Sequence, residues 1–218
     1  EDQRGVPHVT PTTPVSRLAA KDFVSVLDLA PAEFDHLLAL AAELKVRRAR
    51  GESSPQALAG RHVAILFEKP SLRTRITFVI AVRELGGEVI EPPPDVVFGG
   101  RETVEDVAHN LERWLSGVII RTYAQERLAR VAAAATRMHV VNALTDEEHP
   151  CQALADIMTL GERFGSTRGL KLTYVGDGNN VAASLAHAGA LAGLQMTIAS
   201  PKGYELPATV VADCARVA

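Results

Sequence analysis

The sequence predicts an α/β fold made of two doubly wound parallel-sheet domains, the second of them incomplete within these 218 residues. Two observations lead to this fold class. Short apolar runs typical of buried strands alternate along the chain with longer segments of helical periodicity. Strands in a parallel sheet are joined by helices that cover both faces, so such strands are apolar throughout, as they are here.

The first elements are predicted to be a helix, a strand, a second helix and a short strand. Residues 31–50 carry apolar side chains at helical spacing, begin with a proline and are followed by Gly51, a common helix stop. The run HVAILFE, residues 62–68, is typical of a buried strand. We expect a helix from about Leu72 to Leu85, closed by two glycines, and then a short strand in EVIEP.

The same alternation continues over the next forty or so residues. TVEDVAHNLERWL, residues 103–115, predicts a helix, and GVIIRT, residues 117–122, a strand. AQERLARVAAAAT, residues 124–136, predicts another helix, and HVVNAL, residues 139–144, another strand. These strands and helices would extend one parallel sheet.

A fresh β-α-β unit follows a long helix. The helix is expected over HPCQALADIMTLGERF, residues 149–164. LKLTYVGD at 170–177, NNVAASLAHAGALAG at 179–193 and QMTIASP at 195–201 then predict strand, helix and strand, and residues 205–218 one further helix. The second sheet would thus have two strands, where about five are common.

We therefore expect three regions in the chain. Residues 1–15 would be a flexible N-terminal arm, residues 16–148 a first domain, and residues 149–218 an interdomain helix with the start of a second domain. The N-terminal stretch EDQRGVPHVTPTTP lacks the apolar segment of a signal peptide.

Composition excludes several classes of function. With 47% hydrophobic residues, 22% charged residues and a formal net charge of −3, the chain resembles soluble globular proteins and not proteins that bind nucleic acid through bulk basic charge. No apolar run approaches the roughly 20 residues of a membrane span. Cys151 and Cys214 have neither a disulfide pattern nor CxxC spacing, so we expect a cytoplasmic protein without membrane or nucleic-acid partners.

The stretch FEKPSLRTR joins the first strand to the second helix and concentrates hydroxyl and guanidinium groups. Ser71, Arg73, Thr74 and the first amides of the helix can surround a phosphate, whose charge the helix dipole favours. An N-cap serine followed by solvated arginines, Arg75 among them, explains the same local pattern equally well. Both alternatives remain open on this stretch alone.

Two further strand ends carry polar side chains. Arg121 ends an apolar strand, where its charge is costly to bury unless it meets an anion or forms a structural salt bridge. His149 and Gln152 follow the HVVNAL strand and open a helix, whose positive potential favours a neutral imidazole that donates to a carbonyl. Alone, His149 is more often a cap or a satisfied buried histidine.

The glycine turn GDGNN, residues 176–180, is not a dinucleotide fingerprint, because Val181 occupies the position of the third glycine. It is either an ordinary tight turn or a means of placing an asparagine amide at the interdomain cleft. Cys151 is expected to be a packing residue and not a nucleophile. Glu147 and Glu148 are expected to form a solvated acidic turn, and the scattered histidines predict no metal site.

Taken together, SLRTR, IRT, HPCQALAD and GDGNN, in this order and at these separations, resemble the aspartate/ornithine carbamoyltransferase family. The resemblance runs from about Ser16 to the end of the chain. HPCQ is similar to the ornithine branch, because the aspartate branch typically has HPTQ.

The resemblance implies a carbamoyl-phosphate domain, an amino-acid domain and a homotrimer, or a multiple of trimers, with active sites shared between neighbours. It implies transfer of the carbamoyl group from carbamoyl phosphate to the side-chain amine of L-ornithine, giving L-citrulline and phosphate in arginine metabolism, without a cofactor or metal. Arg73, Arg121 and His149 would be catalytic. Carried over by motif, the carbamoyl-phosphate contacts would be Ser71, Leu72, Arg73, Thr74, Arg121, His149 and Gln152, and the ornithine contact Asn180.

The sequence departs from the family pattern at several places. Leu72 replaces the threonine of STRTR, Val79 replaces a glutamate, and Val97 stands in the loop DVVFGG where ornithine enzymes often have a glutamine that reaches the neighbouring site. The Ser-Met-Gly and His-Cys-Leu-Pro loops of the family do not occur by Ala218. One alternative is a carbamoyltransferase with another acceptor, such as N-acetylornithine or putrescine. A second is a non-catalytic carbamoyltransferase-like scaffold. A third, a nicotinamide-dependent oxidoreductase, would be supported by YVGDGNNV only.

Overall fold

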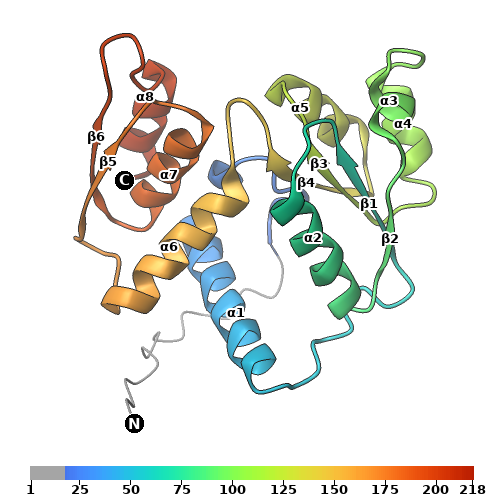
Figure 1. Cartoon of the computed structure of the whole chain (residues 1–218), viewed down its shortest axis with the longest axis horizontal. Helices are drawn as coiled ribbons and strands as arrows, with labels where there is room; N and C mark the ends of the chain where they lie inside the picture. The colour runs from blue at the N-terminus through green and yellow to red at the C-terminus, as the bar shows by residue number, and fades with distance from the viewer. Residues whose placement is uncertain (1–17) are drawn as a thin grey trace.

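The computed structural model describes residues 18–218, and the expected arm at residues 1–15 lies outside them. Two α/β units lie side by side, with α1 and α6 between their lower parts in the view of Figure 1. Along the chain, the elements are η1 (Val26–Asp28), α1 (Pro31–Ala49), β1 (His62–Phe67), α2 (Leu72–Glu84), β2 (Glu88–Ile90), α3 (Pro94–Phe98), α4 (Val104–Leu111), β3 (Gly117–Arg121), α5 (Gln125–Ala134), β4 (His139–Leu144), α6 (Pro150–Phe164), β5 (Lys171–Val175), α7 (Asn180–Leu191), β6 (Gln195–Ala199) and α8 (Ala208–Val217).

The first unit contains a four-stranded parallel sheet with the order β2-β1-β3-β4. The second contains the parallel pair β5-β6, which is the whole of its sheet within residues 18–218. Helical crossovers join successive strands, as the alternation of apolar runs and helices predicts. The α/β class with an incomplete second sheet is confirmed.

Helices cover both faces of the first sheet, so that it is doubly wound. Along β1, Ala64 and Leu66 pack into a core beneath α4 and α5, while Val63, Ile65 and Phe67 pack into a second core beneath α2. Successive side chains of a strand point to opposite faces, so burial of every one from Val63 onward requires cover on both.

A third core joins the two units. It contains Val26 and Phe34 from the η1–α1 region, Ile157 from α6, and Leu185 and Ala188 from α7. Its members come from segments far apart in the sequence, so η1, α1 and α6 hold the second unit against the first.

Three local features differ from the sequence prediction. DVVFGG is not wholly a loop, because residues 94–98 form α3 and Val97 packs partly buried against the core beneath α4 and α5. The helix expected to reach residue 115 ends at Leu111, after which the backbone forms turns. Phe23 forms an isolated parallel bridge with Val141 beside β4.

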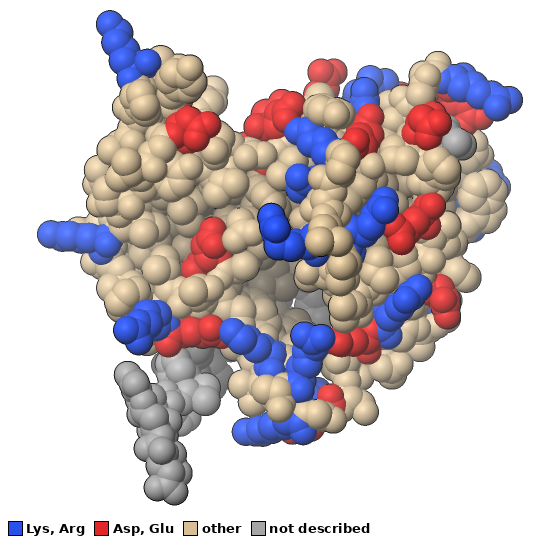
Figure 2. Space-filling model, in the orientation of Figure 1, with Lys and Arg blue, Asp and Glu red and all other residues tan. Residues whose placement is uncertain are grey.

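The surface carries charge of both signs. On the face in Figure 2, acidic and basic side chains are interspersed over both units. No helix within residues 18–218 has the length and apolar character needed to cross a membrane.

Candidate functional site

Three predicted site segments meet at the carboxyl edge of the first sheet. β1, β3 and β4 are neighbours, and Phe67, Arg121 and Leu144 lie side by side in register at their ends. Ser71 follows β1 by a short loop, and His149 follows β4 in the same way. Ligands of open α/β sheets bind beyond this edge, so the fold brings these segments to the expected place.

The start of α2 has unused hydrogen-bonding capacity. Ser71 occupies the N-cap position with an extended backbone, yet its hydroxyl makes no capping hydrogen bond. The first amides of a helix have no partner within the helix, so they remain available to an anion here. This observation weakens the alternative of an ordinary capping serine.

The two arginines of SLRTR have different roles. Arg75 pairs with Glu91 at 3.1 Å, which makes it part of a surface ion pair. Arg73 is exposed and has no ion-pair partner among residues 18–218, so its guanidinium is the one left for an anion. Thr74 is half-buried, and the side chain of Leu72 is 73% exposed.

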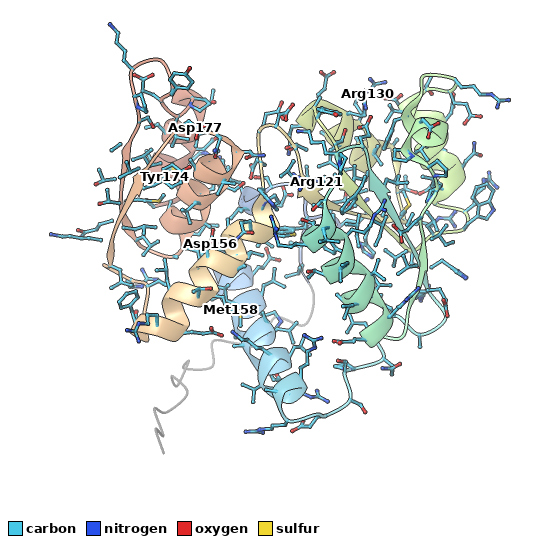
Figure 3. The ribbon with its side chains drawn as sticks, in the orientation of Figure 1. Arg121, Arg130, Asp156, Met158, Tyr174 and Asp177 are labelled. Carbon is cyan, nitrogen blue, oxygen red and sulfur yellow. The ribbon has the colours of Figure 1, made fainter. Side chains whose placement is uncertain are left out.

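Arg121 is half-buried and lacks a carboxylate partner within the described part of the chain. Its Nε atom is buried without a hydrogen-bond acceptor, and burial lowers the pKa of the guanidinium. The nearby Glu68 instead binds Arg127 Nη1 at 2.7 Å and accepts from the Thr122 hydroxyl. A structural salt bridge therefore does not explain Arg121, which lies on the side of the first unit nearest the second (Figure 3).

His149 is a neutral imidazole beside this guanidinium. It occupies the N-cap position of α6, and its backbone N–H donates to Ser184 Oγ at 2.8 Å. Burial, and secondarily the charge of Arg121, lower the His149 pKa to about 4. The ring Nδ1 is buried without a partner among the described residues. The ring is thus neutral near pH 7 and can donate one hydrogen bond.

Glu148 is not part of a solvated acidic turn, so this prediction is wrong. The residue is only 8% exposed, and its carboxylate accepts from Ser25 Oγ at 2.5 Å and Ser184 Oγ at 2.6 Å. Burial alone would raise its pKa, but His187, Ser184 and Ser25 together lower it. Glu147 is exposed as expected, and its Oε2 accepts from the backbone N–H of Gln125.

The Glu148 cluster fixes the loop that carries His149. Ser184 belongs to α7 of the second unit, and it touches both the Glu148 carboxylate and the His149 backbone. His187 Nδ1, also on α7, lies 3.4 Å from Glu148. The sequence did not predict Ser184 and His187 as partners of Glu148. The one signal for them is their position on the face of α7 that packs nearest η1 and α6.

The remaining predicted residues are already engaged with protein atoms. Gln152 is exposed and its Nε2 donates to Asp156 Oδ1 at 2.9 Å, which leaves the carboxamide oxygen available. Burial raises the pKa of Asp156, and the Gln152 contact opposes that change. Asn180 Nδ2 donates to the carbonyl oxygen of Thr145 at 2.5 Å, so this amide nitrogen ties α7 to the β4–α6 loop.

The GDGNN turn has a structural reason for its second glycine. A Cβ atom on Gly178 would lie 2.5 Å from the backbone N of Leu206, so the chain can approach this closely only at glycine. Asn179 caps α7 by accepting from the amides of Val181 and Ala182. The first asparagine of GDGNN therefore has a structural role as the N-cap of α7.

Cys151 is a packing residue, as expected. Its thiol donates to the carbonyl oxygen of Asn142 at 3.5 Å, and burial raises its pKa to about 12, which disfavours a reactive thiolate. Within residues 18–218, no three His, Cys, Asp or Glu side chains cluster as metal ligands would.

The edge thus presents helix amides, one solvent-facing guanidinium, one half-buried guanidinium and a neutral imidazole. This set can hold a small phosphorylated molecule and stabilise negative charge on a carbonyl oxygen.

The chain matches the family models of both domains. The carbamoyl-phosphate-binding domain of aspartate/ornithine carbamoyltransferases matches residues 21–162, and their aspartate/ornithine-binding domain matches residues 168–218. An ornithine carbamoyltransferase of Parafrankia sp. is 49% identical over 189 residues, which are 86% of this chain and 59% of that protein. The chain spans between 59% and 65% of the first curated relatives that it matches.

Solved structures give the same assignment. The ornithine carbamoyltransferase of Thermus thermophilus matches with a TM-score of 0.83 and 43% identity, over 90% of this chain and 67% of that one. An aspartate transcarbamoylase of Trypanosoma cruzi, solved with carbamoyl phosphate, matches with a TM-score of 0.82 and 25% identity, over 93% of this chain and 64% of that one. With two family models covering most of its length, the chain belongs to the aspartate/ornithine carbamoyltransferase family.

Proposed function

We propose that this protein transfers the carbamoyl group of carbamoyl phosphate to the side-chain amine of L-ornithine. In the reaction, the neutral side-chain amine of L-ornithine attacks the carbamoyl carbon, the C–O bond to phosphate breaks, and the amine loses a proton. The products are L-citrulline and phosphate. The names of the relatives and the match of both domain models support this proposal.

The observation that carries the proposal is the pairing of Arg121 and His149 at neighbouring strand ends. Each has one buried nitrogen, Nε in Arg121 and Nδ1 in His149, without a hydrogen-bond partner in residues 18–218. Such groups are costly to bury unless a ligand binds them. A ligand with both a phosphate and a carbonyl oxygen satisfies both nitrogens.

The chemistry follows from where charge develops. As the amine attacks, the carbonyl oxygen gains negative charge, and His149 and Arg121 stabilise it as preorganised donors. The amides of Ser71 to Thr74 and the Arg73 guanidinium hold the phosphate, which leaves with its charge already compensated. The free oxygen of Gln152 accepts from the carbamoyl NH₂ group, because Asp156 already occupies its amide nitrogen.

The experiment is an assay for citrulline with the intact protein, ornithine and carbamoyl phosphate. N-acetylornithine, putrescine and aspartate serve as alternative acceptors in parallel reactions. Formation of citrulline only with ornithine supports the proposal. Turnover of a different acceptor would reassign the substrate, and turnover of none of the four would remove the catalytic proposal for this chain.

A second candidate is a carbamoyl-phosphate-binding protein that has no acceptor. It is favoured by Asn180, whose amide nitrogen already donates to the carbonyl oxygen of Thr145. Calorimetry distinguishes it from the enzyme, because it predicts binding of carbamoyl phosphate without turnover of any acceptor.

We further propose that copies of the chain associate through the outer face of α2, as a homotrimer. Leu72, Ile76 and Ile80 form a stripe at helical spacing and are 73%, 49% and 40% exposed. Ile90 on the adjacent β2 is also exposed. Apolar surface of this kind is stabilised by burial against a partner. The cross-subunit contact expected near Val97 is part of this proposal.

Two free thiols, Cys151 and Cys214, support the cytoplasm as the proposed compartment. Carbamoyl phosphate and ornithine are the proposed small-molecule partners.

A further inference from the structure

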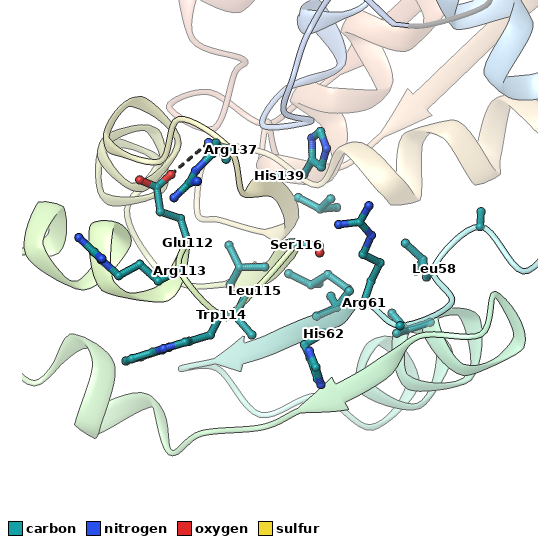
Figure 4. A pocket seen from close by; sticks show the side chains of 18 residues that line it. Leu58, Arg61, His62, Glu112, Arg113, Trp114, Leu115, Ser116, Arg137 and His139 are labelled. Carbon is teal, nitrogen blue, oxygen red and sulfur yellow. Dashed lines mark hydrogen bonds between the residues drawn. The ribbon is translucent and has the colours of Figure 1, made fainter.

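A cavity of about 700 Å³ opens at the edge of the first sheet opposite to the candidate active site. It is lined by the beginnings of β1, β3 and β4, which include Val63, Gly117 and His139 (Figure 4). The lining follows β3 as far as Ile119, and it includes neither Arg121 nor His149. The carbamoyltransferase site does not use any residue that lines it.

The cavity concentrates positive charge in a chain whose formal net charge is −3. Arg61, Arg113 and Arg137 line it, and none of the three has an ion-pair partner among the residues that the structure describes. Figure 4 shows the side chain of Arg61 near the ring of His139 and that of Arg137 beside Glu112. All three residues are exposed, and an anion bound in the cavity interacts favourably with their charge.

The carboxylate that lines the cavity is held mainly by backbone amides, and it also interacts with the charge of Arg137. Glu112 Oε2 accepts from the backbone amides of Thr136 at 2.7 Å and Arg137 at 3.0 Å. These amides, that of Arg137 first, lower the pKa of Glu112, and the Thr136 hydroxyl and the charge of Arg137 lower it further. The carboxylate is thus committed to closing the turn between α5 and β4.

The rest of the wall is apolar or aromatic. Val63, Leu115 and Val118 form part of it, and Trp114 stands at its side with 67% of its surface exposed. An exposed indole beside guanidinium groups can stack on a flat ring. The volume lies in the range of small-molecule sites, which commonly combine apolar walls with a few charged groups.

We propose that this cavity binds a small organic anion that joins a phosphate or carboxylate group to a planar apolar ring. Arg61 and Arg137 bind the anionic group, and Trp114 contacts the ring. The site is separate from the carbamoyl-phosphate site and does not depend on the proposed catalytic function. We name it the amino-edge site.

Trp114 is the single tryptophan of the sequence and therefore reports on this cavity alone. The experiment titrates the 218-residue chain with phenyl phosphate, and in parallel with inorganic phosphate, while tryptophan fluorescence is recorded. We expect a saturable change with phenyl phosphate and weaker binding of inorganic phosphate, which lacks the ring.

Four variants locate the binding. Arg61→Ala and Arg137→Ala are each expected to weaken binding of phenyl phosphate about tenfold, the effect of losing one charge-assisted contact. Arg163→Ala removes an exposed arginine of α6 and is the matched control, and Arg121→Ala tests the opposite edge of the sheet. Neither of these two is expected to change the titration. Arg61→Gln and Arg137→Gln replace any alanine variant whose circular dichroism shows that it has not folded.

Three results would overturn the proposal. The first is the absence of a saturable fluorescence change. The second is equal binding by the Arg61 and Arg163 variants, or loss of binding in Arg121→Ala. The third is a fluorescence change that follows protein concentration without added anion, which would make the cavity a contact between copies of the chain.

Discussion

The His149 pKa is the property of the site that the structure predicts most sharply. Burial, and secondarily the neighbouring Arg121, lower it from 6.5 to about 4. This lowering corresponds to about 3 kcal/mol at roughly 1.36 kcal/mol per pKa unit. The His149 side chain is partly exposed, so water screens the charges. We therefore expect this pKa shift to contribute about 1 to 2 kcal/mol to the free energy of unfolding.

The perturbation is Arg121→Ala, which removes the neighbouring charge and leaves the imidazole in place. The assay is a titration of the His149 ring followed by NMR, with the His149→Asn variant used to assign its signal. In the unmodified chain, His149 should titrate near pH 4. In Arg121→Ala its pKa should rise and yet stay below 6.5, because burial is the larger cause.

The same shift has a consequence for stability with a defined sign. The unfolded chain binds a proton at His149 near pH 6.5 and the folded chain only near pH 4, so stability is lost as the pH falls through this window. The His149→Asn variant should lack that part of the loss. A His149 signal that titrates near 6.5 in the unmodified chain, or one that Arg121→Ala does not move, would refute the reasoning.

Four further predictions follow. Arg73→Ala should weaken carbamoyl-phosphate binding by about 1.5 to 3 kcal/mol in calorimetry, and an unchanged affinity would remove Arg73 from the site. Glu148→Ala should lower the free energy of unfolding by about 2 to 4 kcal/mol in urea titrations, because buried donors lose their acceptor; Glu148→Gln should cost less, and equal costs would contradict this. Ile76→Asp should abolish self-association in sedimentation experiments, whereas an unchanged oligomer would place the interface elsewhere. Gly178→Ala should destabilise the chain by about 1 to 3 kcal/mol, and a neutral effect would contradict the close approach of Leu206.

Local sequence patterns predicted the elements well because they depend on neighbouring residues. HVVNAL matches β4 from His139 to Leu144, and the helix expected from Leu72 ends within one residue of its observed end. The sequence also predicted that Arg121 and His149 lie at the same edge of the sheet, because parallel strands place their carboxyl ends together.

Long-range pairing could not be predicted in the same way. Glu148 is buried by Ser25 and Ser184, which are 123 and 36 residues away in the chain, and its neighbour Glu147 is exposed. The different roles of Arg73 and Arg75 also depended on a distant partner, because Glu91 pairs with only one of them. Charge and spacing within the motif carry no information about such partners.

The short helix α3 escaped prediction for a local reason. Three consecutive prolines, Pro92 to Pro94, and two glycines, Gly99 and Gly100, flank only four other helical positions, which is the pattern of a loop. Packing of Val97 and Phe98 against the core beneath α4 and α5 holds this turn of helix in place. Tertiary contacts outweighed the local preference.

Calorimetry with carbamoyl phosphate tests the central claim most directly, namely that the carboxyl edge of the first sheet is a binding site for this molecule. The 218-residue chain should show saturable binding, which Arg121→Ala weakens about tenfold or more and Arg163→Ala leaves unchanged. Absence of binding, or equal affinities in the two variants, would contradict the account.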